Sequence, residues 1–172
     1  MVLFLVGFMG SGKSSVGRRI AAALGYDFVD TDKVIEESTG VTISEIFAYE
    51  GEEGFRSRER ELLESLPASG NVIVATGGGM PCVGDNLELM QQRGKVIYFK
   101  LSPERLVARL GRGRARRPKI AGMNDEELLA YISTLLPQRE VWYERADVVI
   151  DCNGANDDYL INHLKEYLNY YK

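Results

Sequence analysis

The stretch Gly7-Phe8-Met9-Gly10-Ser11-Gly12-Lys13-Ser14 decides how the rest of this chain of 172 residues is interpreted. It fits the pattern G-x-x-x-x-G-K-[ST], in which backbone N–H groups of a glycine-rich loop bind phosphate oxygens. A continuous apolar run, residues 2–6, comes before it, and Val16, Ile20 and Leu24 follow at helical spacing. The motif therefore lies between a predicted buried strand and a predicted helix, which is the context that it requires.

This loop predicts a site for a nucleoside triphosphate and its Mg²⁺ ion. Lys13 can reach the β- and γ-phosphates, and the hydroxyl of Ser14 can ligate the metal. The N-terminus of the following helix adds its positive dipole end. A glycine-rich turn without a ligand is the alternative, but the agreement of motif and context favours the phosphate site. The residues expected to bind the nucleotide here are Gly10, Ser11, Gly12, Lys13, Ser14 and Ser15.

Predicted strands and helices alternate along the whole chain. After residues 2–6, further short strands are expected at 28–29, 72–75, 96–99 and 148–150, with helical patterns between them. This alternation indicates an α/β fold with a largely parallel sheet. We expect one P-loop domain over residues 1–172, a three-layer sandwich around a mostly five-stranded parallel sheet. Residues 111–122 have no apolar period and are predicted to be a mobile loop inserted as a lid.

The composition excludes several classes of function. Apolar residues make up 45% of the chain, charged residues 27%, and the net charge is −4, which argues against a dedicated binder of nucleic acid or anionic membranes. The start of the chain has no signal-peptide or membrane-span pattern, which favours the cytoplasm. Cys82 and Cys152 stand alone and suggest neither a disulfide framework nor a zinc site.

Asp30-Thr31-Asp32 follows the second predicted strand, at the sheet edge where ligands of open α/β folds bind. Two carboxylates one residue apart can divide the work of a phosphoryl transfer. One can hold waters of Mg²⁺, and the other can accept a hydrogen bond from an attacking hydroxyl. The alternative is a turn in which an aspartate caps the next helix.

Two more segments could bind an acceptor. Arg56 follows Gly51-Glu52-Glu53-Gly54-Phe55, and Glu59, three positions later, can hold its guanidinium in place for bidentate capture of a carboxylate. A solvated helix face with ion pairs is the alternative. Gly77-Gly78-Gly79, after a buried strand, permits close approach of a polyol or a phosphate, or forms a loose turn.

The stretch from Arg109 to Lys119 is the densest basic run. It could be a solvated loop, an RNA contact or a lid over ATP. Glycines at 111, 113 and 122 offer hinges, and water must be kept from the γ-phosphate. The lid is therefore the interpretation we favour.

Taken together, these segments resemble the shikimate kinase family. The resemblance spans nearly the whole chain, in the family's order and roughly its spacing. The combination of Asp-x-Asp, Gly-Glu-x-x-Phe-Arg-x-x-Glu and the triple glycine is far more specific than the phosphate loop alone. Arg117-Pro118 and Arg139 with Tyr143, Ala146 and Asp147 also fit the family pattern.

The resemblance implies transfer of the γ-phosphoryl group of ATP to the 3-hydroxyl of shikimate, in aromatic amino-acid biosynthesis. It implies ATP and Mg²⁺ as cofactors, with Ser14 on the metal and Asp30 reaching it through water. Lys13, Asp32 and Arg117 are the expected catalytic residues, with Asp32 as base. Arg117 is expected to bind ATP as well, since it would reach from the lid to both the substrate and the transferring phosphoryl group. The expected substrate-binding residues are Asp32, Arg56, Gly78, Gly79 and Arg139.

Some points stay open at the level of sequence. Lys119-Ile120 stands where the family usually has two leucines, and either Arg109 or Arg112 could stack on adenine. Rival functions are a kinase for gluconate or a nucleoside monophosphate, a nucleotide-binding switch, and a nucleic-acid-binding module. We expect a monomer with shikimate as its partner and with neither nucleic acid nor membrane.

Overall fold

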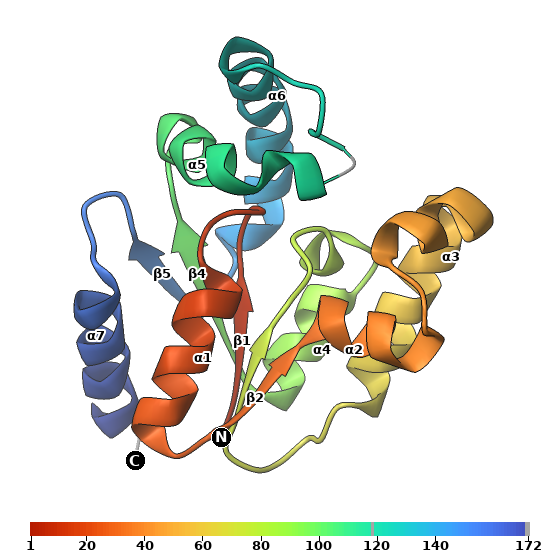
Figure 1. Ribbon diagram of the computed structural model, residues 1–172. Helices are drawn as coiled ribbons and strands as arrows, with labels where there is room; N and C mark the ends of the chain where they lie inside the picture. The colour runs from red at the N-terminus through yellow and green to blue at the C-terminus, as the bar shows by residue number, and fades with distance from the viewer. Residues whose placement is uncertain (118, 171–172) are drawn as a thin grey trace.

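The computed structural model describes residues 1–117 and 119–170. Its strands form one sheet in which every neighbouring pair is parallel, in the order β2-β3-β1-β4-β5 (Figure 1). The predicted five-stranded parallel sheet is thus confirmed. The strands are β1 (Val2–Val6), β2 (Asp27–Asp30), β3 (Val72–Ala75), β4 (Lys95–Lys100) and β5 (Val148–Asp151).

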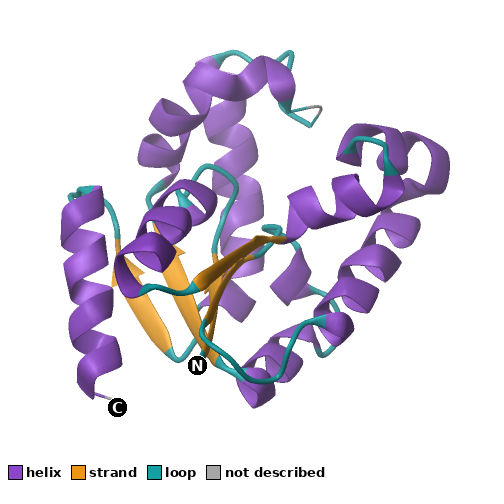
Figure 2. Cartoon of the chain, turned by 60° about the horizontal axis from the view of Figure 1, so that its bottom comes forward, coloured by secondary structure: helices purple, strands orange, loops and turns teal. Residues whose placement is uncertain are grey.

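Helices cover both faces of this sheet, as a three-layer sandwich requires (Figure 2). In Figure 1, α1 lies in front of the strands with α7 beside it, and α4 lies behind them. All five residues of β1 and all four of β3 are buried, which explains why these strands are uninterrupted apolar runs. The helices are α1 (Lys13–Leu24), α2 (Thr31–Thr39), α3 (Ile43–Ser65), α4 (Asn86–Arg93), α5 (Pro103–Leu110), α6 (Asp125–Tyr143) and α7 (Asp157–Tyr170).

Local sequence signals set several helix ends. Thr42 begins α3 with a reciprocal capping box, in which its hydroxyl accepts from the backbone N–H of Glu45 at 3.3 Å. Thr42 is therefore the N-cap of α3. Gly51, with φ +71°, kinks α3, and the helix continues through Gly54. The kink lets both halves of α3 supply side chains to one side of the molecule.

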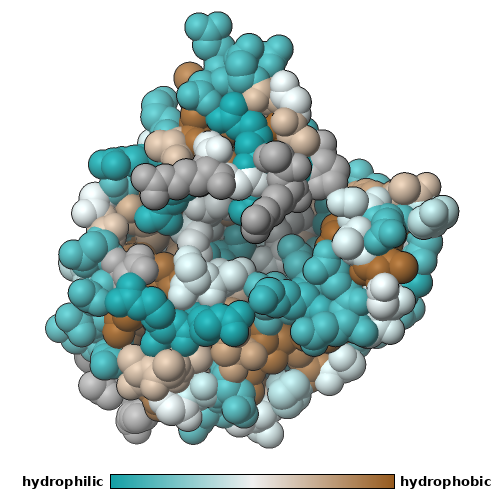
Figure 3. All heavy atoms as spheres, viewed as in Figure 1, coloured by the Kyte–Doolittle hydropathy of each residue, from teal (hydrophilic) through white to brown (hydrophobic). Residues whose placement is uncertain are grey.

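The chain segments around the carboxyl ends of the strands form the site. β1 lies between β3 and β4, so the strand order reverses there and a crevice opens beyond β1. Above this edge lie α5, α6 and the 3₁₀ helix η2 (Gly111–Arg116), while α2 and α3 lie to one side (Figure 1). The surface is hollowed between these two groups, with hydrophilic side chains around the opening (Figure 3).

The loop predicted over residues 111–122 is wrong for its first half, because residues 111–116 form η2. Two contacts anchor this segment. Ile120 is 1% exposed and packs into the main core, and Arg114 donates to the carbonyl of Met123 at 2.6 Å and forms an ion pair with Asp125. The sequence did not predict this order, since Ile120 is the only large apolar residue of the segment and gives no periodicity. Its mobility stays a prediction.

None of the helices formed by residues 1–117 and 119–170 has both the length and the apolar character that crossing a bilayer demands.

Candidate active site

The phosphate loop adopts the backbone that its glycines were expected to allow. Gly7, Gly10 and Gly12 have φ values of +141°, +81° and +98°, which L side chains rarely adopt. A side chain at position 10 would also have no room, since a Cβ on Gly10 would lie 2.8 Å from the Leu110 side chain. The loop is thereby held in a curve that leads into the N-terminus of α1, where free N–H groups favour an anion.

Lys13 lies folded back along this loop. Its ammonium donates to the carbonyls of Gly7 at 2.8 Å and Phe8 at 2.9 Å, and the residue is 7% exposed. Burial lowers the pKa of Lys13 to about 8, against the opposing charge of Asp32. An ammonium held this way can move from neutral carbonyls to a phosphate without leaving the loop.

A cavity of about 480 Å³ opens over the loop and contains most of the predicted nucleotide-binding residues. Ser11 is the exception, being 1% exposed and set inside the loop, where its hydroxyl lies 3.4 Å from the Lys13 ammonium. Arg109 borders the cavity and donates to the carbonyl of Ser11 at 2.9 Å. The lining residues are Met9, Gly10, Gly12, Lys13, Ser14, Ser15, Asp30, Asp32, Thr76, Gly78, Arg109 and Arg117.

The two predicted aspartates lie at the junction of β2 and α2. Asp30 caps α2, accepting from the backbone N–H of Lys33 at 3.4 Å, and it also borders the nucleotide cavity. The capping interpretation is therefore confirmed, and the role of Asp30 toward Mg²⁺ stays a prediction. Asp32 lies in the first turn of α2, is exposed, and borders the nucleotide cavity. Partial loss of water around its carboxylate, and then the charge of Asp30, raise the pKa of Asp32.

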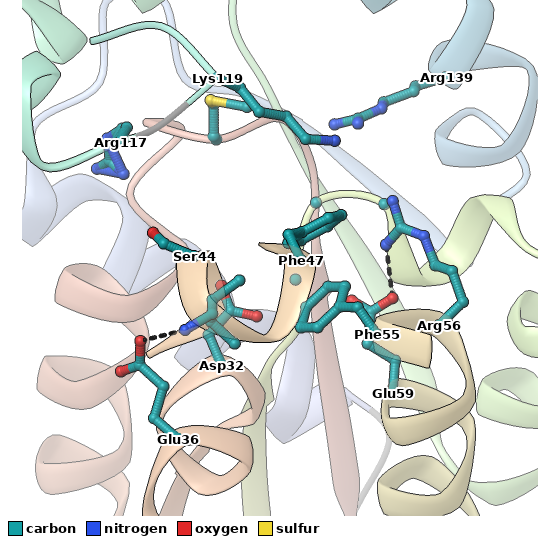
Figure 4. A pocket seen from close by; sticks show the side chains of 15 residues that line it. Asp32, Glu36, Ser44, Phe47, Phe55, Arg56, Glu59, Arg117, Lys119 and Arg139 are labelled. Carbon is teal, nitrogen blue, oxygen red and sulfur yellow. Dashed lines mark hydrogen bonds and ion pairs between the residues drawn. The ribbon is translucent and has the colours of Figure 1, made fainter. Parts of the chain in front are cut away.

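A second cavity, of about 560 Å³, adjoins the first and shares Met9, Asp32, Gly78 and Arg117 with it. Figure 4 shows its cationic side chains arriving from different elements, with Arg56 from α3 and Arg139 from α6. Aromatic rings of α3 form one wall. The remaining lining residues are Glu36, Ile43, Ser44, Phe47, Phe55, Arg56, Glu59, Gly77, Gly79, Lys119 and Arg139. We call this the acceptor cavity.

Carboxylates on two sides fix the Arg56 guanidinium. Its Nη1 donates to Glu59 Oε2 at 2.6 Å, and its Nη2 donates to Glu52 Oε1 at 2.9 Å. The Glu59 side chain is fully buried, whereas that of Glu52 is 62% exposed. Burial raises the pKa of Glu59 to about 7 although Arg56 opposes this, and its Oε1 has no hydrogen-bond partner among the described residues. The predicted ion pair between Arg56 and Glu59 is therefore present, and it orients Arg56 into the acceptor cavity.

The triple glycine makes room for these charged groups. A Cβ on Gly79 would lie 2.5 Å from Arg56 Nη2, and one on Gly77 would lie 2.5 Å from Glu59 Oε1. The backbone is held from both sides: Gly77 N–H donates to Thr31 Oγ1 at 2.9 Å, and the Tyr143 hydroxyl donates to the Gly78 carbonyl. The segment is consequently an ordered cavity floor and not a loose turn.

The remaining predicted arginines lie in the lid segment, in α5 and in α6. Arg117 borders both cavities, and Arg139 lies with its guanidinium 5.3 Å from the centre of the Phe8 ring. Pro118 and the side chain of Arg112 lie outside what the structure describes. Of the two candidates for adenine stacking, only Arg109 can therefore be located, at the edge of the nucleotide cavity.

Comparison with known proteins decides the family. The profile of the family described as shikimate kinase matches residues 9–169. The chain belongs to the shikimate kinase family. A shikimate kinase of Parabacteroides distasonis is 41% identical over 149 residues, which cover 87% of this chain and 86% of that protein.

Solved shikimate kinases have the same fold. The enzyme of Bacteroides thetaiotaomicron has a TM-score of 0.92 at 34% identity, covering 98% of both chains. The enzyme of Acinetobacter baumannii, solved in complex with shikimate, has a TM-score of 0.85 at 35% identity and covers 99% of this chain and 94% of that one. The resemblance read from the sequence is thereby confirmed.

The structure places at the acceptor cavity several residues that the sequence left unassigned. Phe47 and Phe55 form the aromatic wall, Glu52 is the second partner of Arg56, and Lys119 reaches the acceptor cavity from the lid. The two phenylalanines are apolar residues within a helical pattern, which is typical of core positions and gives no signal of a binding role. Glu52 lies four positions before Arg56, a spacing that predicts an ion pair. For Lys119 only the departure from the family's leucines was a signal.

Proposed function

We propose that this chain transfers the γ-phosphoryl group of ATP to the 3-hydroxyl of shikimate, giving shikimate 3-phosphate for aromatic amino-acid biosynthesis. One observation carries the proposal. The phosphate-loop cavity opens into a cavity that holds the guanidinium groups of Arg56 and Arg139, and Asp32 lies where the two meet. A carboxylate-bearing polyol bound by those arginines would present a hydroxyl toward the nucleotide.

On the donor side, the residues from Gly10 to Ser15 would bind the phosphates, with the Lys13 ammonium on the β- and γ-phosphates. Arg117 would add positive charge from the lid. These groups neutralise the charge that spreads over the transferring phosphoryl group, which is the main requirement of this reaction. Lys13 and Arg117 line the same cavity, which supports a role for both of them at the transferring phosphoryl group.

The residues around the nucleotide cavity could also hold Mg²⁺. The described residues contain no cluster of three or more acidic, histidine or cysteine side chains, and Mg²⁺ bound to a nucleotide needs none, since it keeps waters and phosphate ligands. Ser14 would hold the ion directly and Asp30 through water, since both border the nucleotide cavity. When bound, the ion supplies positive charge at the phosphate oxygens.

On the acceptor side, Arg56 and Arg139 would clamp the carboxylate of shikimate, and the backbone of Gly78 and Gly79 would contact the ring. Asp32 would accept the proton of the 3-hydroxyl while the oxygen of that hydroxyl bonds to the γ-phosphorus. The bond from that phosphorus to the bridging oxygen of ADP breaks in the same displacement. The raised pKa of Asp32 supports this role, because it makes the carboxylate a better base than a solvated one.

We also propose that the protein acts in the cytoplasm as a monomer. Cys82 and Cys152 are free thiols, as proteins of reducing compartments have. Large exposed apolar side chains in the described part, such as Tyr49, Val141 and Tyr159, belong to different helices and not to one continuous helix face. Light scattering of the purified protein tests the oligomeric state.

A coupled assay of ADP release tests the proposed function. Shikimate is compared with gluconate, AMP and CMP at equal concentration, each with ATP and Mg²⁺. We expect turnover with shikimate alone, and mass spectrometry should find one added phosphoryl group on it. Turnover with a nucleotide or gluconate but not with shikimate would refute the proposal.

A further inference from the structure

Lys119 is a feature of the acceptor cavity that the proposed roles do not use. Its side chain extends from the lid and lines the cavity, and its ammonium lies 4.8 Å from the centre of the Phe47 ring (Figure 4). Phe47 belongs to the first half of α3, on the other side of the cavity from the lid. The contact thus joins two parts of the chain that the cavity separates.

Both ends of this contact are anchored. Ile120, the next residue, is 1% exposed in the main core, so the backbone at Lys119 is tied to the body of the protein. Phe47 packs on Phe55 with ring centres 4.8 Å apart, and both belong to the smaller cluster around Ile35 and Ile46. A lysine between two anchored points can hold the distance across the cavity.

The charges around the cavity support the same placement. An ammonium is attracted to the face of an aromatic ring, and among the described residues the Lys119 ammonium takes part in no ion pair. The nearby carboxylate of Glu52 has a lowered pKa, first because Arg56 donates to it and second because of the charge of Lys119. Lys119 therefore lies near the opening where an anionic acceptor must enter, as a fourth cation beside Arg56, Arg117 and Arg139.

We propose that Lys119 is a positioning residue which links the lid to Phe47 of α3 and so closes the acceptor cavity around its anionic substrate. A neutral side chain there would lose the attraction to the ring. The inference rests on the proposed function, because its consequence is measured on the shikimate reaction. The shikimate reaction by itself does not require this link, since Arg117 can supply the positive charge at the phosphoryl group without Lys119.

A double-mutant cycle on the Michaelis constant for shikimate tests the link. The variants are Lys119→Met, Phe47→Leu and both together, and Lys119→Arg serves as the conservative replacement. We expect Lys119→Met to raise KM about two- to five-fold with little change in kcat, the range expected for an exposed cation–π contact. Lys119→Arg should restore KM, and the double variant should be no worse than Phe47→Leu alone. Lys165→Met, on α7 outside both cavities, is the matched control and should match the wild type.

The outcomes separate the link from other roles. Additive effects of Lys119→Met and Phe47→Leu would mean that the lysine acts by charge alone, and an unchanged KM in Lys119→Met would mean that it does not act at all. Either result overturns the proposal. If the wild type does not turn over shikimate, the proposed function fails first, so the two failures are distinguishable. Thermal melts of each variant show whether a change in KM has its origin in lost folding.

Discussion

Replacing Glu59 by glutamine should make the protein more stable at pH 8 and less able to bind its acceptor. The Glu59 carboxylate is fully buried, one of its oxygens lacks a partner among the described residues, and burial raises its pKa from 4.5 to about 7. Its ionised form is therefore disfavoured in the folded state. Glutamine has the same shape and carries no charge to bury, so it removes this cost.

The size of the effect follows from linkage. A folded-state pKa above the unfolded one means that the folded protein binds the proton more tightly. The stabilisation is fully present below about pH 4.5 and is lost as the pH rises through about 7. The loss amounts to about 3 kcal/mol at most, at about 1.4 kcal/mol for each pH unit between the two values. Glu59→Gln should thus be up to about 3 kcal/mol more stable than wild type at pH 8, and about equal to it near pH 4.5.

Urea denaturation of both proteins at several pH values between 5 and 8 measures this difference. Every other titrating group is common to the two proteins, so the difference in unfolding free energy isolates Glu59. Glu61→Gln, at an exposed position of α3, is the matched control and should show no such trend. A Glu59→Gln protein less stable than wild type at pH 8, or a difference that does not vary with pH, would refute the reasoning.

The same variant should lose function. The bond of 2.6 Å from Arg56 to Glu59 is charge-assisted, and such bonds are worth about 1.5–3 kcal/mol. With glutamine the guanidinium is held less firmly, and KM for shikimate should rise about ten-fold or more. A gain in stability with a loss of acceptor binding would show that Glu59 is retained to orient Arg56.

Three further changes probe the cavity. Asp32→Asn should lower kcat about 100-fold or more with a modest change in KM, because the amide cannot accept the proton of the hydroxyl; equal turnover in a stopped-flow assay would remove its role as base. Arg56→Lys should raise KM for shikimate about ten-fold, because an ammonium cannot form the bidentate contact; an unchanged KM would contradict the carboxylate clamp. Gly79→Ala should raise KM in steady-state assays, because its Cβ would lie 2.5 Å from Arg56 Nη2 and displace it. Gly154→Ala, where a Cβ would meet nothing within 4 Å, should behave like wild type.

The sequence was sufficient where a motif and its surroundings agreed. Five apolar residues followed by the glycine-rich loop predicted β1, a phosphate site and the start of α1, and the structure has both elements at these positions. The parallel sheet followed from alternation of strands and helices. The pairing of Arg56 with Glu59 was predictable too, since residues three positions apart on a helix are neighbours.

The sequence was insufficient where an arrangement depends on contacts between distant segments. Ile120 anchors the lid through burial in the main core, and one large apolar residue in a basic segment gives no periodicity from which that burial could be predicted. The fit of Gly79 against Arg56 depends on how the loop after β3 meets α3, which neither segment specifies alone.

The acceptor cavity shows why an acidic protein can bind an acid. The net charge of −4 is a sum over the whole chain, whereas a ligand meets only the charges within a few ångströms. Four cations (Arg56, Arg117, Lys119 and Arg139) and three carboxylates (Asp32, Glu36 and Glu59) line this cavity. Because Arg56 already pairs with Glu59 and Glu52, an acidic ligand also depends on the positive charges of Arg117, Lys119 and Arg139. Two of those three come from the lid segment and the third from α6. Closure of the lid would bring Arg117 and Lys119 close to the other cations of the cavity, and a bound anion would offset the repulsion between them. Lid closure and binding of the anionic acceptor should therefore reinforce each other.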